Sequence, residues 1–544
     1  MIKIRIKEKK EKQKGFMKGV IALMVAQVVI KFLGLIYKWY LTNRPGFGDE
    51  GNAIYSAGFS IYALLLTISS TGVPNAVAKL VSENMARGDY KGAHRIFKIS
   101  FATFSVIGFI GTLILFLGAR YIADVWLSIP DAELTLVALS PAIFFVAVIS
   151  VFRGYFNGRE DMKATANSQT LEQLFKTVLT ILVVEIVAIC SGINTKLMAA
   201  GANLATTLAT IGSFMYLYMY YRIRRKDLAR EIVESRAFPT KSIIGTVRNI
   251  LKVSIPMSLS SILTSINRNV DSMTVKRGLQ TFLTETEALK QYGILSGKVD
   301  TLVALPLSFN IAFATALVPA ISASMARGDE KTANKRVSFS LLVTMLIGMP
   351  CMVGMMIFAE PILQLLFPNA SEGTLIFQVS ALSIIFTVLG QTVNGALQGL
   401  GKIFLPAIAL SIGVAVKFIL NLILVSIPQI GAAGAAFATA VCHAIAFFIC
   451  YYALRKNMKL DLTFSKFIVK PILATIIMSI CSYSVYLLLI GINEGKMATI
   501  ISIIIAIIIY MLTIVVLKIF TKEELLMVPY GNKIINILEK IRIY

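Results

Sequence analysis

The chain has 544 residues, of which 56% are hydrophobic and only 15% are charged, and its formal net charge is +24. Soluble domains carry about 25% charged residues, so this composition excludes a soluble enzyme. The basic residues lie in short segments between apolar runs, which indicates membrane topology rather than a surface for nucleic acid.

Apolar stretches long enough to cross a membrane recur along the whole chain, since a span needs about 20 residues. The N-terminal segment is basic and lacks a small-residue cleavage site, so the first span is expected to be retained. The sequence predicts about fourteen spans, at 16–41, 52–74, 97–118, 132–152, 165–190, 197–221, 249–275, 293–320, 337–358, 374–399, 403–427, 431–454, 467–490 and 497–520. Lys and Arg concentrate in both terminal segments and in every second loop, which predicts that both termini are cytoplasmic.

An internal repeat divides the predicted spans. MARGDYKGA at 85–93 and MARGDEKTA at 325–333 match at seven of nine positions, at an offset of 240. RGYFNG at 153–158 aligns with NGALQG at 394–399, at an offset of 241. A shift by six spans preserves orientation, so the repeat predicts two parallel six-helix bundles related by an axis along the membrane normal.

The predicted domain organisation follows from this repeat. The linker between the bundles is basic and is expected to contain a short amphipathic helix on the cytoplasmic surface. The full order is a cytoplasmic N-terminus at 1–15, a six-helix bundle at 16–221, the linker at 222–247, a second bundle at 248–454, two additional helices at 455–520 and a cytoplasmic tail at 521–544.

Charged residues inside spans are the candidate site, because each costs about 2.5–3.5 kcal/mol on insertion scales and usually faces the protein interior. Substrate binding in a cavity is predicted for Lys31, Lys38, Arg268, Lys298, Gln27 and Asn267. Charge pairing or binding of a coupling ion is predicted for Asp271, Asp300, Glu172, Lys176, Lys417 and Asn421. Within the spans the basic residues outnumber the acidic ones, which favours an anionic cargo such as a pyrophosphate.

Some of these residues have a second interpretation. Glu172 and Lys176 are spaced as an i,i+4 pair and fit a purely structural role. Lys38 and Glu185 lie near the predicted outer face of the membrane, where side chains can snorkel to the headgroups. Asp271 fits either neutralisation of Arg268 or binding of a coupling cation. The odd number of cysteines and the absence of CxxC support neither a disulfide framework nor a metal site.

Three segments carry a resemblance to a known family: FRGYFNGREDMKATANSQTLEQ at 152–173, STGVPNAVAKLVSENMARGD at 70–89 and LPLSFNIAFATALVPAIS at 305–322. They resemble the SpoVB/YtgP branch of the polysaccharide exporters, in the multidrug/oligosaccharidyl-lipid/polysaccharide superfamily, and this branch is similar to the MurJ lipid II flippases. The resemblance covers essentially the whole chain and is less specific for the cargo than for the branch.

The resemblance implies an all-α integral membrane fold with two bundles around a V-shaped central cavity, alternating access, and two C-terminal helices that form a groove for lipid tails. It implies a flippase for an undecaprenyl-pyrophosphate-linked cell-wall precursor, foremost lipid II, in the bacterial cytoplasmic membrane. No cofactor is expected beyond a coupling cation or the membrane potential. The expected partners are the lipid-linked anionic sugar and membrane lipid, with other cell-wall synthesis proteins as further candidates and no nucleic acid.

Other functions remain as alternatives. A flippase for another lipid-linked polysaccharide fits the same motifs. A cation-coupled multidrug antiporter of the same superfamily would need a net acidic cavity for cationic drugs, which the excess of basic residues disfavours. A polytopic glycosyltransferase or ligase would need a large polar catalytic loop or paired carboxylates beside a metal. The chain shows neither, and a non-transporting scaffold would not explain the buried charges.

Overall fold

The computed structural model describes residues 29–67, 72–159, 161–233, 235, 242–326, 328–402, 404–460, 462–491, 495–521 and 524. Within these ranges the regular structure is helical, without strands, which confirms the predicted all-α fold. Ten helices of this described part are long and apolar enough to cross a membrane. The count of fourteen spans stays a prediction.

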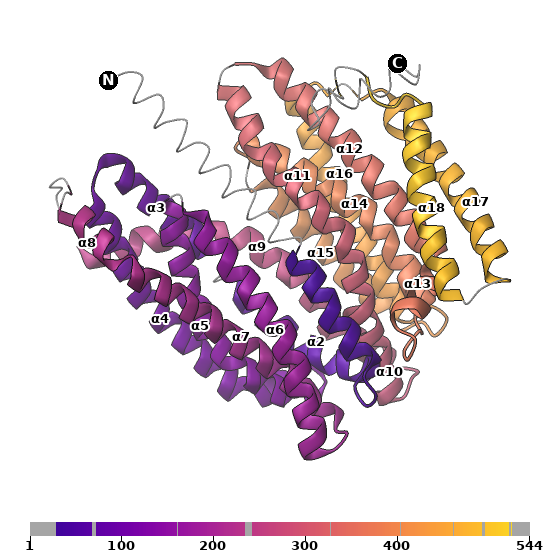
Figure 1. Cartoon of the computed structure of the whole chain (residues 1–544), viewed down its shortest axis with the longest axis horizontal. Helices are drawn as coiled ribbons and strands as arrows, with labels where there is room; N and C mark the ends of the chain where they lie inside the picture. The colour runs from indigo at the N-terminus through magenta and orange to yellow at the C-terminus, as the bar shows by residue number, and fades with distance from the viewer. Residues whose placement is uncertain are drawn as a thin grey trace. The chain divides into compact units, whose positions relative to one another are not determined.

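The helices divide into two compact units, Met1–Lys298 and Val299–Tyr544, which Figure 1 colours from indigo to magenta and from rose to yellow. The predicted limits of the six-helix bundles, 16–221 and 248–454, stay predictions.

The first unit begins, in the described part, with an unlabelled helix at 29–43. The α-helices that follow are α2 (Gly48–Thr67), α3 (Val73–Arg87), α4 (Tyr90–Tyr121), α5 (Glu133–Gly158), α6 (Met162–Ser191), α7 (Thr195–Ile223), α8 (Arg225–Val233), α9 (Ile243–Leu279) and α10 (Glu285–Gly293). Shorter helical turns are the π-helix η2 (Ile122–Leu127), the 3-10 turn η3 (Pro130–Ala132) and the π-helix η4 (Ile294–Val299). The amphipathic helix predicted in the linker is present as α8, whose Leu228 is buried.

The second unit follows the order α11 (Asp300–Ala326), α12 (Glu330–Ile357), α13 (Ala359–Leu366), α14 (Thr374–Gly399), α15 (Leu405–Leu424), α16 (Ala432–Asn457), the π-helix η5 (Ser465–Val469), α17 (Lys470–Ile490) and α18 (Gly495–Val516). Pro406 lies in the first turn of α15, as Pro74 does in α3. The missing N–H of proline has no intrahelical partner there, so neither residue breaks its helix.

The repeated nonapeptides form the same turn in both units. Gly88 and Gly328 have φ angles of 79° and 72°, in the left-handed region that favours glycine after a helix. Asp89 and Asp329 then cap α4 and α12, because each carboxylate accepts a hydrogen bond from the backbone N–H three residues later, at 2.7 and 3.0 Å. The sequence repeat is therefore also a structural repeat at this turn.

The second repeated motif places glycines where two helices meet. Gly154 and Gly158 of α5 lie against α3, and Gly395 and Gly399 of α14 lie against α11. A Cβ atom built at Gly154 would lie 2.7 Å from a carbonyl oxygen of α3, and one built at Gly395 would lie 2.6 Å from a carbonyl oxygen of α11. Both units therefore use glycine in a GxxxG pattern to bring two helix backbones together.

Gly395→Ala is expected to lower the free energy of unfolding by about 1–3 kcal/mol, because the added methyl group must push α14 away from a backbone atom of α11. Gly390→Ala on the same helix is the matched control, since a Cβ there meets nothing within 4 Å. It should be neutral or stabilising by up to about 1 kcal/mol. Thermal unfolding in detergent measures both, and equal losses for the two variants would contradict the packing argument.

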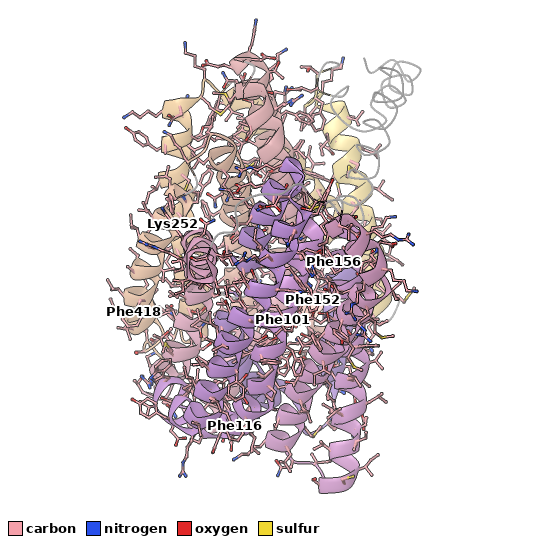
Figure 2. All side chains as sticks on the ribbon, turned by 90° about the vertical axis from the view of Figure 1, so that its left-hand side faces the viewer. Phe101, Phe116, Phe152, Phe156, Lys252 and Phe418 are labelled. Carbon is pink, nitrogen blue, oxygen red and sulfur yellow. The ribbon has the colours of Figure 1, made fainter. Side chains whose placement is uncertain are left out.

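Aromatic side chains fill the core of the first unit. Phe101 of α4 and Phe152 and Phe156 of α5 are labelled in Figure 2, and the rings of Phe101 and Phe152 meet edge to face at 5.9 Å. The outer surfaces of the helices are apolar as well, with Leu117 of α4 78% exposed and Leu512 of α18 60% exposed. Such surfaces suit contact with acyl chains rather than water.

Candidate functional site

One face of α2 organises the buried charges of the first unit. It carries polar and aromatic residues at helical spacing, which we call the α2 stripe: Asp49, Asn52, Tyr55, Ser56 and Phe59. Three lysines reach this stripe, one each from the helix at 29–43, from α6 and from η4: Lys38, Lys176 and Lys298. All three were predicted as site residues from the sequence, and the structure brings them to one helix.

Lys38 is buried, with only 6% of its surface exposed. Its ammonium group donates hydrogen bonds to Oδ1 of Asn52 at 3.2 Å and to Oγ of Ser56 at 3.4 Å. It also lies 4.3 Å from the centre of the Tyr55 ring. The alternative in which Lys38 snorkels to the headgroups is therefore wrong, because the α2 stripe holds its charge inside the unit.

Lys176 is 7% exposed and sits among aromatic rings. Its Nζ lies 4.1 Å from the ring centre of Phe59, 5.2 Å from that of Tyr37 and 5.9 Å from that of Tyr55. Its contacts with described residues include no carboxylate within ion-pair distance. A cation–π contact contributes about 0.5–2 kcal/mol when it is desolvated, so the rings hold the ammonium without neutralising it.

Lys298 is fully buried and pairs with Asp49 of the α2 stripe, with 3.0 Å between Nζ and Oδ2. Two glycines allow this approach. A Cβ at Gly293 would lie 1.8 Å from the backbone oxygen of Asp49, and one at Gly297 would lie 2.7 Å from the Asn52 side chain. The close packing of α10 and η4 on α2 places the lysine beside its carboxylate.

Lys298→Ala is expected to destabilise the protein by about 3–5 kcal/mol, because it removes the ammonium group from a buried ion pair and leaves the Asp49 carboxylate without that partner. The double variant Lys298→Met, Asp49→Asn should recover most of that loss, since it removes both charges together. Thermal unfolding in detergent measures the recovery. A double variant no more stable than Lys298→Ala would show that the pair does not couple.

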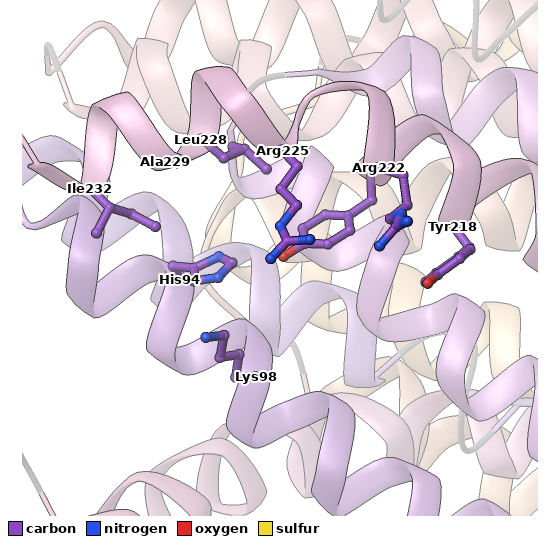
Figure 3. Close-up of a pocket in the computed structure, with 9 residues that line it drawn as sticks. His94, Lys98, Tyr218, Arg222, Arg225, Leu228, Ala229 and Ile232 are labelled. Carbon is purple, nitrogen blue, oxygen red and sulfur yellow. The ribbon is translucent and has the colours of Figure 1, made fainter.

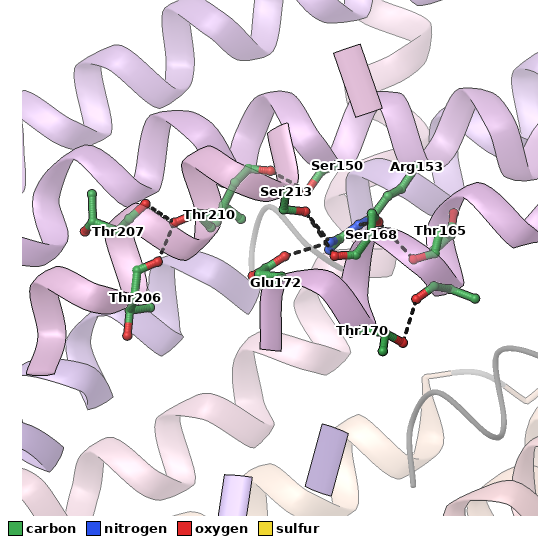
Figure 4. A network of polar contacts seen from close by, with 12 residues as sticks. Ser150, Arg153, Thr165, Ser168, Thr170, Glu172, Thr206, Thr207, Thr210 and Ser213 are labelled. Carbon is green, nitrogen blue, oxygen red and sulfur yellow. Dashed lines mark hydrogen bonds and ion pairs between the residues drawn. The ribbon is translucent and has the colours of Figure 1, made fainter. Parts of the chain in front are cut away.

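Arg153 links α5 to α6 and α7 through a polar network (Figure 4). Its guanidinium group donates to Oγ of Ser168 at 2.9 Å, to Oε2 of Glu172 at 2.7 Å and to Oγ of Ser213 at 3.2 Å. The predicted pairing of Glu172 with Lys176 is therefore wrong. Glu172 forms its ion pair with Arg153, and Lys176 makes cation–π contacts with the aromatic rings.

Glu185 of α6 forms a bidentate ion pair with Arg44. The distances are 2.8 Å from Nε to Oε1 and 2.9 Å from Nη2 to Oε2. The Tyr40 hydroxyl also donates to Oε1 of the same carboxylate. The two-pronged geometry fixes Glu185 against the helix at 29–43 and the turn that follows it, and its predicted position near the headgroups stays a prediction.

The remaining predicted residues are more scattered. Asn267 is buried on α9, Asp271 is half-buried there, and Lys31 is exposed on the helix at 29–43. In the second unit Asp300 is exposed at the start of α11, and Lys417 and Asn421 are buried on α15. Gln27 and the side chain of Arg268 lie outside the described residues. Their roles stay predictions.

The second unit has a buried network that sequence reasoning missed. Nδ2 of Asn310 donates to the backbone oxygen of Val388 at 2.7 Å and to Oε1 of Gln391 at 3.1 Å. Oγ1 of Thr344 donates to Oδ1 of Asn310 at 3.0 Å and lies 2.8 Å from Oγ1 of Thr392. These bonds tie α11, α12 and α14 together. Their neutral side chains gave no charge signal in the sequence.

Arg153 and the α2 stripe were missed for different reasons. Arg153 lies one residue beyond the predicted span 132–152, so it was counted as a loop residue. The α2 stripe holds Tyr and Phe, which are more often core residues than site residues. Its spacing of three and four residues was the available signal, since it puts polar and aromatic side chains on one helix face.

Comparison with known proteins agrees with this architecture. The family model described as polysaccharide biosynthesis protein matches residues 16–325, and the model described as lipid II flippase MurJ matches residues 246–508. The chain is 29% identical to the uncharacterized membrane protein YabM of Bacillus subtilis (strain 168), over 96% of both chains. It is 25% identical to lipid II flippase MurJ of the same organism, over 78% of this chain and 80% of the relative.

Solved structures show the same fold. The lipid II flippase MurJ in its inward closed conformation matches with a TM-score of 0.70 and 17% identity, over 92% of this chain and 99% of that one. Relatives and solved structures described as a lipid II flippase and as multidrug transporters match this chain, which is a multi-pass membrane protein and not an enzyme. It belongs to the polysaccharide biosynthesis protein family and is MurJ-like in sequence and in fold.

Proposed function

We propose that this chain is a flippase that moves an undecaprenyl-pyrophosphate-linked cell-wall precursor, with lipid II as the cargo, across the bacterial cytoplasmic membrane by alternating access. The B. subtilis relative named lipid II flippase MurJ supports this assignment. The distribution of Lys and Arg supports cytoplasmic N- and C-termini.

The observation that carries the proposal is the pair of buried lysines on the α2 stripe. Lys38 and Lys176 both lie over the Tyr55 ring, at 4.3 and 5.9 Å. Lys176 is held by aromatic rings, which leave its positive charge available to an anion. A pyrophosphate carries about two negative charges at neutral pH, and its passage through a low-dielectric region requires nearby cations. Lys176, whose ammonium group contacts aromatic rings, meets that requirement, and Lys38 lies beside it over the same Tyr55 ring.

Further residues complete the proposed cavity. Lys31 and Arg268 are proposed to bind the same headgroup, with Gln27 and Asn267 as hydrogen-bonding partners. Asp271, Asp300, Lys417 and Asn421 are proposed to neutralise charge or to bind a coupling cation. Lys298 lies at the α2 stripe and pairs there with Asp49. We therefore propose that its role is largely structural rather than substrate binding.

A flippase for another lipid-linked polysaccharide is the second candidate. The polysaccharide biosynthesis model that matches residues 16–325 favours it. Lysines that recognise a pyrophosphate do not distinguish the sugars attached to it, so both candidates use the α2 stripe in the same way. A multidrug antiporter is disfavoured, because a cationic drug would be repelled by Lys38 and Lys176.

The deciding experiment reconstitutes the purified chain in liposomes. Flipping is measured for fluorescent lipid II, for a second undecaprenyl-pyrophosphate-linked sugar and for a cationic dye. Flipping of lipid II alone supports the first candidate, and flipping of both lipid-linked sugars supports the second. Transport of the dye without either lipid-linked sugar would overturn the proposal.

Arg268→Ala is expected to lower flipping at least about tenfold, because a hydrogen bond to a charged group contributes about 1.5–3 kcal/mol. Arg268→Lys should restore only part of the activity if bidentate contact with phosphate matters. Complementation of a strain depleted of its lipid II flippase gives a second readout. Full complementation by the double variant Lys31→Ala, Arg268→Ala would contradict the assignment of these two residues.

A further inference from the structure

A pocket of about 310 Å³ lies at one end of the first unit, away from the α2 stripe. It forms where α4 begins, where α7 ends and where α8 passes over both (Figure 3). His94 and Lys98 of α4, Tyr221 and Arg222 of α7 and Arg225 and Leu228 of α8 contribute to its walls.

The pocket gathers positive charge. In Figure 3 the nitrogen-bearing ends of Lys98, Arg222 and Arg225 face the pocket from opposite sides. No ion pair joins any of these three side chains to a described residue. The neighbouring arginines behave differently, since Arg159 pairs with Glu231 and Arg224 pairs with Asp161. Carboxylates therefore neutralise the surroundings and leave the pocket cationic.

The wall beside these cations also offers a neutral hydrogen-bonding group. The His94 ring stacks on Tyr221 with 6.3 Å between centroids and 5° between planes. Nδ1 of His94 is buried and has no hydrogen-bond partner in the described part of the chain. Leu228 of α8 is buried against the unit, which holds the helix over the pocket.

The pocket lies at the boundary between polar and apolar surface. Along α4 the exposed residues become apolar after the first turns, with Val106 60% exposed, and on α7 Met219 and Ile223 are 61% and 78% exposed. Acyl chains fit against such surfaces, and the basic ends of the same helices then lie at the depth of the lipid headgroups.

From this geometry we infer that the pocket binds the phosphate headgroup of an anionic membrane phospholipid, whose acyl chains lie along the exposed faces of α4 and α7. The three cations supply the attraction, and basic pockets between transmembrane helices are a known form of anionic lipid site. A zwitterionic headgroup binds less well, because its ammonium group would meet the same three cations. This lipid site is separate from the proposed cargo site and does not depend on it.

The test uses the purified full chain in nanodiscs that contain phosphatidylglycerol or phosphatidylcholine, with lipid retention measured by native mass spectrometry. The double variant Lys98→Gln, Arg225→Gln is expected to bind phosphatidylglycerol roughly 30-fold more weakly, at about 1 kcal/mol for each basic residue. The matched control is Lys226→Gln, Arg230→Gln. It removes the same charge from exposed residues of α8 that do not line the pocket, and it should change binding less than about threefold.

Each other outcome overturns the inference. Equal losses of phosphatidylglycerol binding in the two double variants would show that the net charge, and not the pocket, attracts the lipid. Equal retention of phosphatidylcholine and phosphatidylglycerol would remove the headgroup specificity. Displacement of the lipid by millimolar inorganic phosphate would make the pocket a site for free phosphate. The single variant Lys98→Gln tests the same site with less effect on folding, because Lys98 is exposed. It should still weaken the binding of phosphatidylglycerol about fivefold, at about 1 kcal/mol for one basic residue.

Discussion

Lys176→Met is expected to lower the flipping of a pyrophosphate-linked lipid at least about tenfold while leaving the thermal unfolding temperature close to that of the unmodified protein. The loss of flipping follows from the removal of a charge whose bond to an anion contributes about 1.5–3 kcal/mol. Stability should hold, because Lys176 is surrounded by the rings of Tyr37, Tyr55 and Phe59. Its removal leaves no carboxylate unpaired, and methionine fills the same apolar space.

Lys163→Met is the control for this prediction. Lys163 lies on the same helix, α6, and its side chain is exposed, so it should retain full flipping. Lys176→Arg keeps the charge and should retain part of the activity. Measurements in proteoliposomes with fluorescent lipid II give the rates. Unchanged flipping in Lys176→Met would remove the α2 stripe from the cargo path, even if the protein proved to be a flippase.

Arg153→Ala is expected to lower the free energy of unfolding by about 3 kcal/mol. The substitution leaves the Glu172 carboxylate, which is 25% exposed, without its 2.7 Å partner. It also removes the hydrogen bonds to Ser168 and Ser213 that link α6 and α7 to α5. The double variant Arg153→Met, Glu172→Gln should regain about half of the loss or more, since neither charge then remains. Unfolding in detergent, followed by circular dichroism, measures the change.

An exposed pair provides the contrast. Arg120 and Asp124 are 81% and 43% exposed at 3.7 Å, one turn apart on one helical run. Arg120→Ala should change stability by less than about 1 kcal/mol, because water already solvates both groups. If both substitutions had the same effect, burial would not be the cause of the Arg153 result.

The membrane class, the all-helical fold and the repeat could be predicted because each depends on local sequence. Spans follow from runs of apolar residues, and the turns at Gly88 and Gly328 follow from a glycine in the left-handed region before a capping Asp. The lysines Lys38, Lys176 and Lys298 could also be identified as buried, because charge inside an apolar run is conspicuous. Asn310 and the aromatic residues of the α2 stripe were missed, since neither residue type by itself stands out in an apolar helix.

The partner of each buried charge was decided only by the tertiary structure. From the sequence, Glu172 and Lys176 have each other as helical neighbours, and such a pair contributes about 0.2–0.5 kcal/mol. A charge-assisted hydrogen bond from another helix contributes more, about 1.5–3 kcal/mol. Glu172 therefore pairs with Arg153 of α5 instead of with Lys176. The rings of α2 and of the helix at 29–43 then surround Lys176. The sequence alone determined that charge is buried here, and packing between helices determined that aromatic rings, rather than the helical neighbour Glu172, surround Lys176.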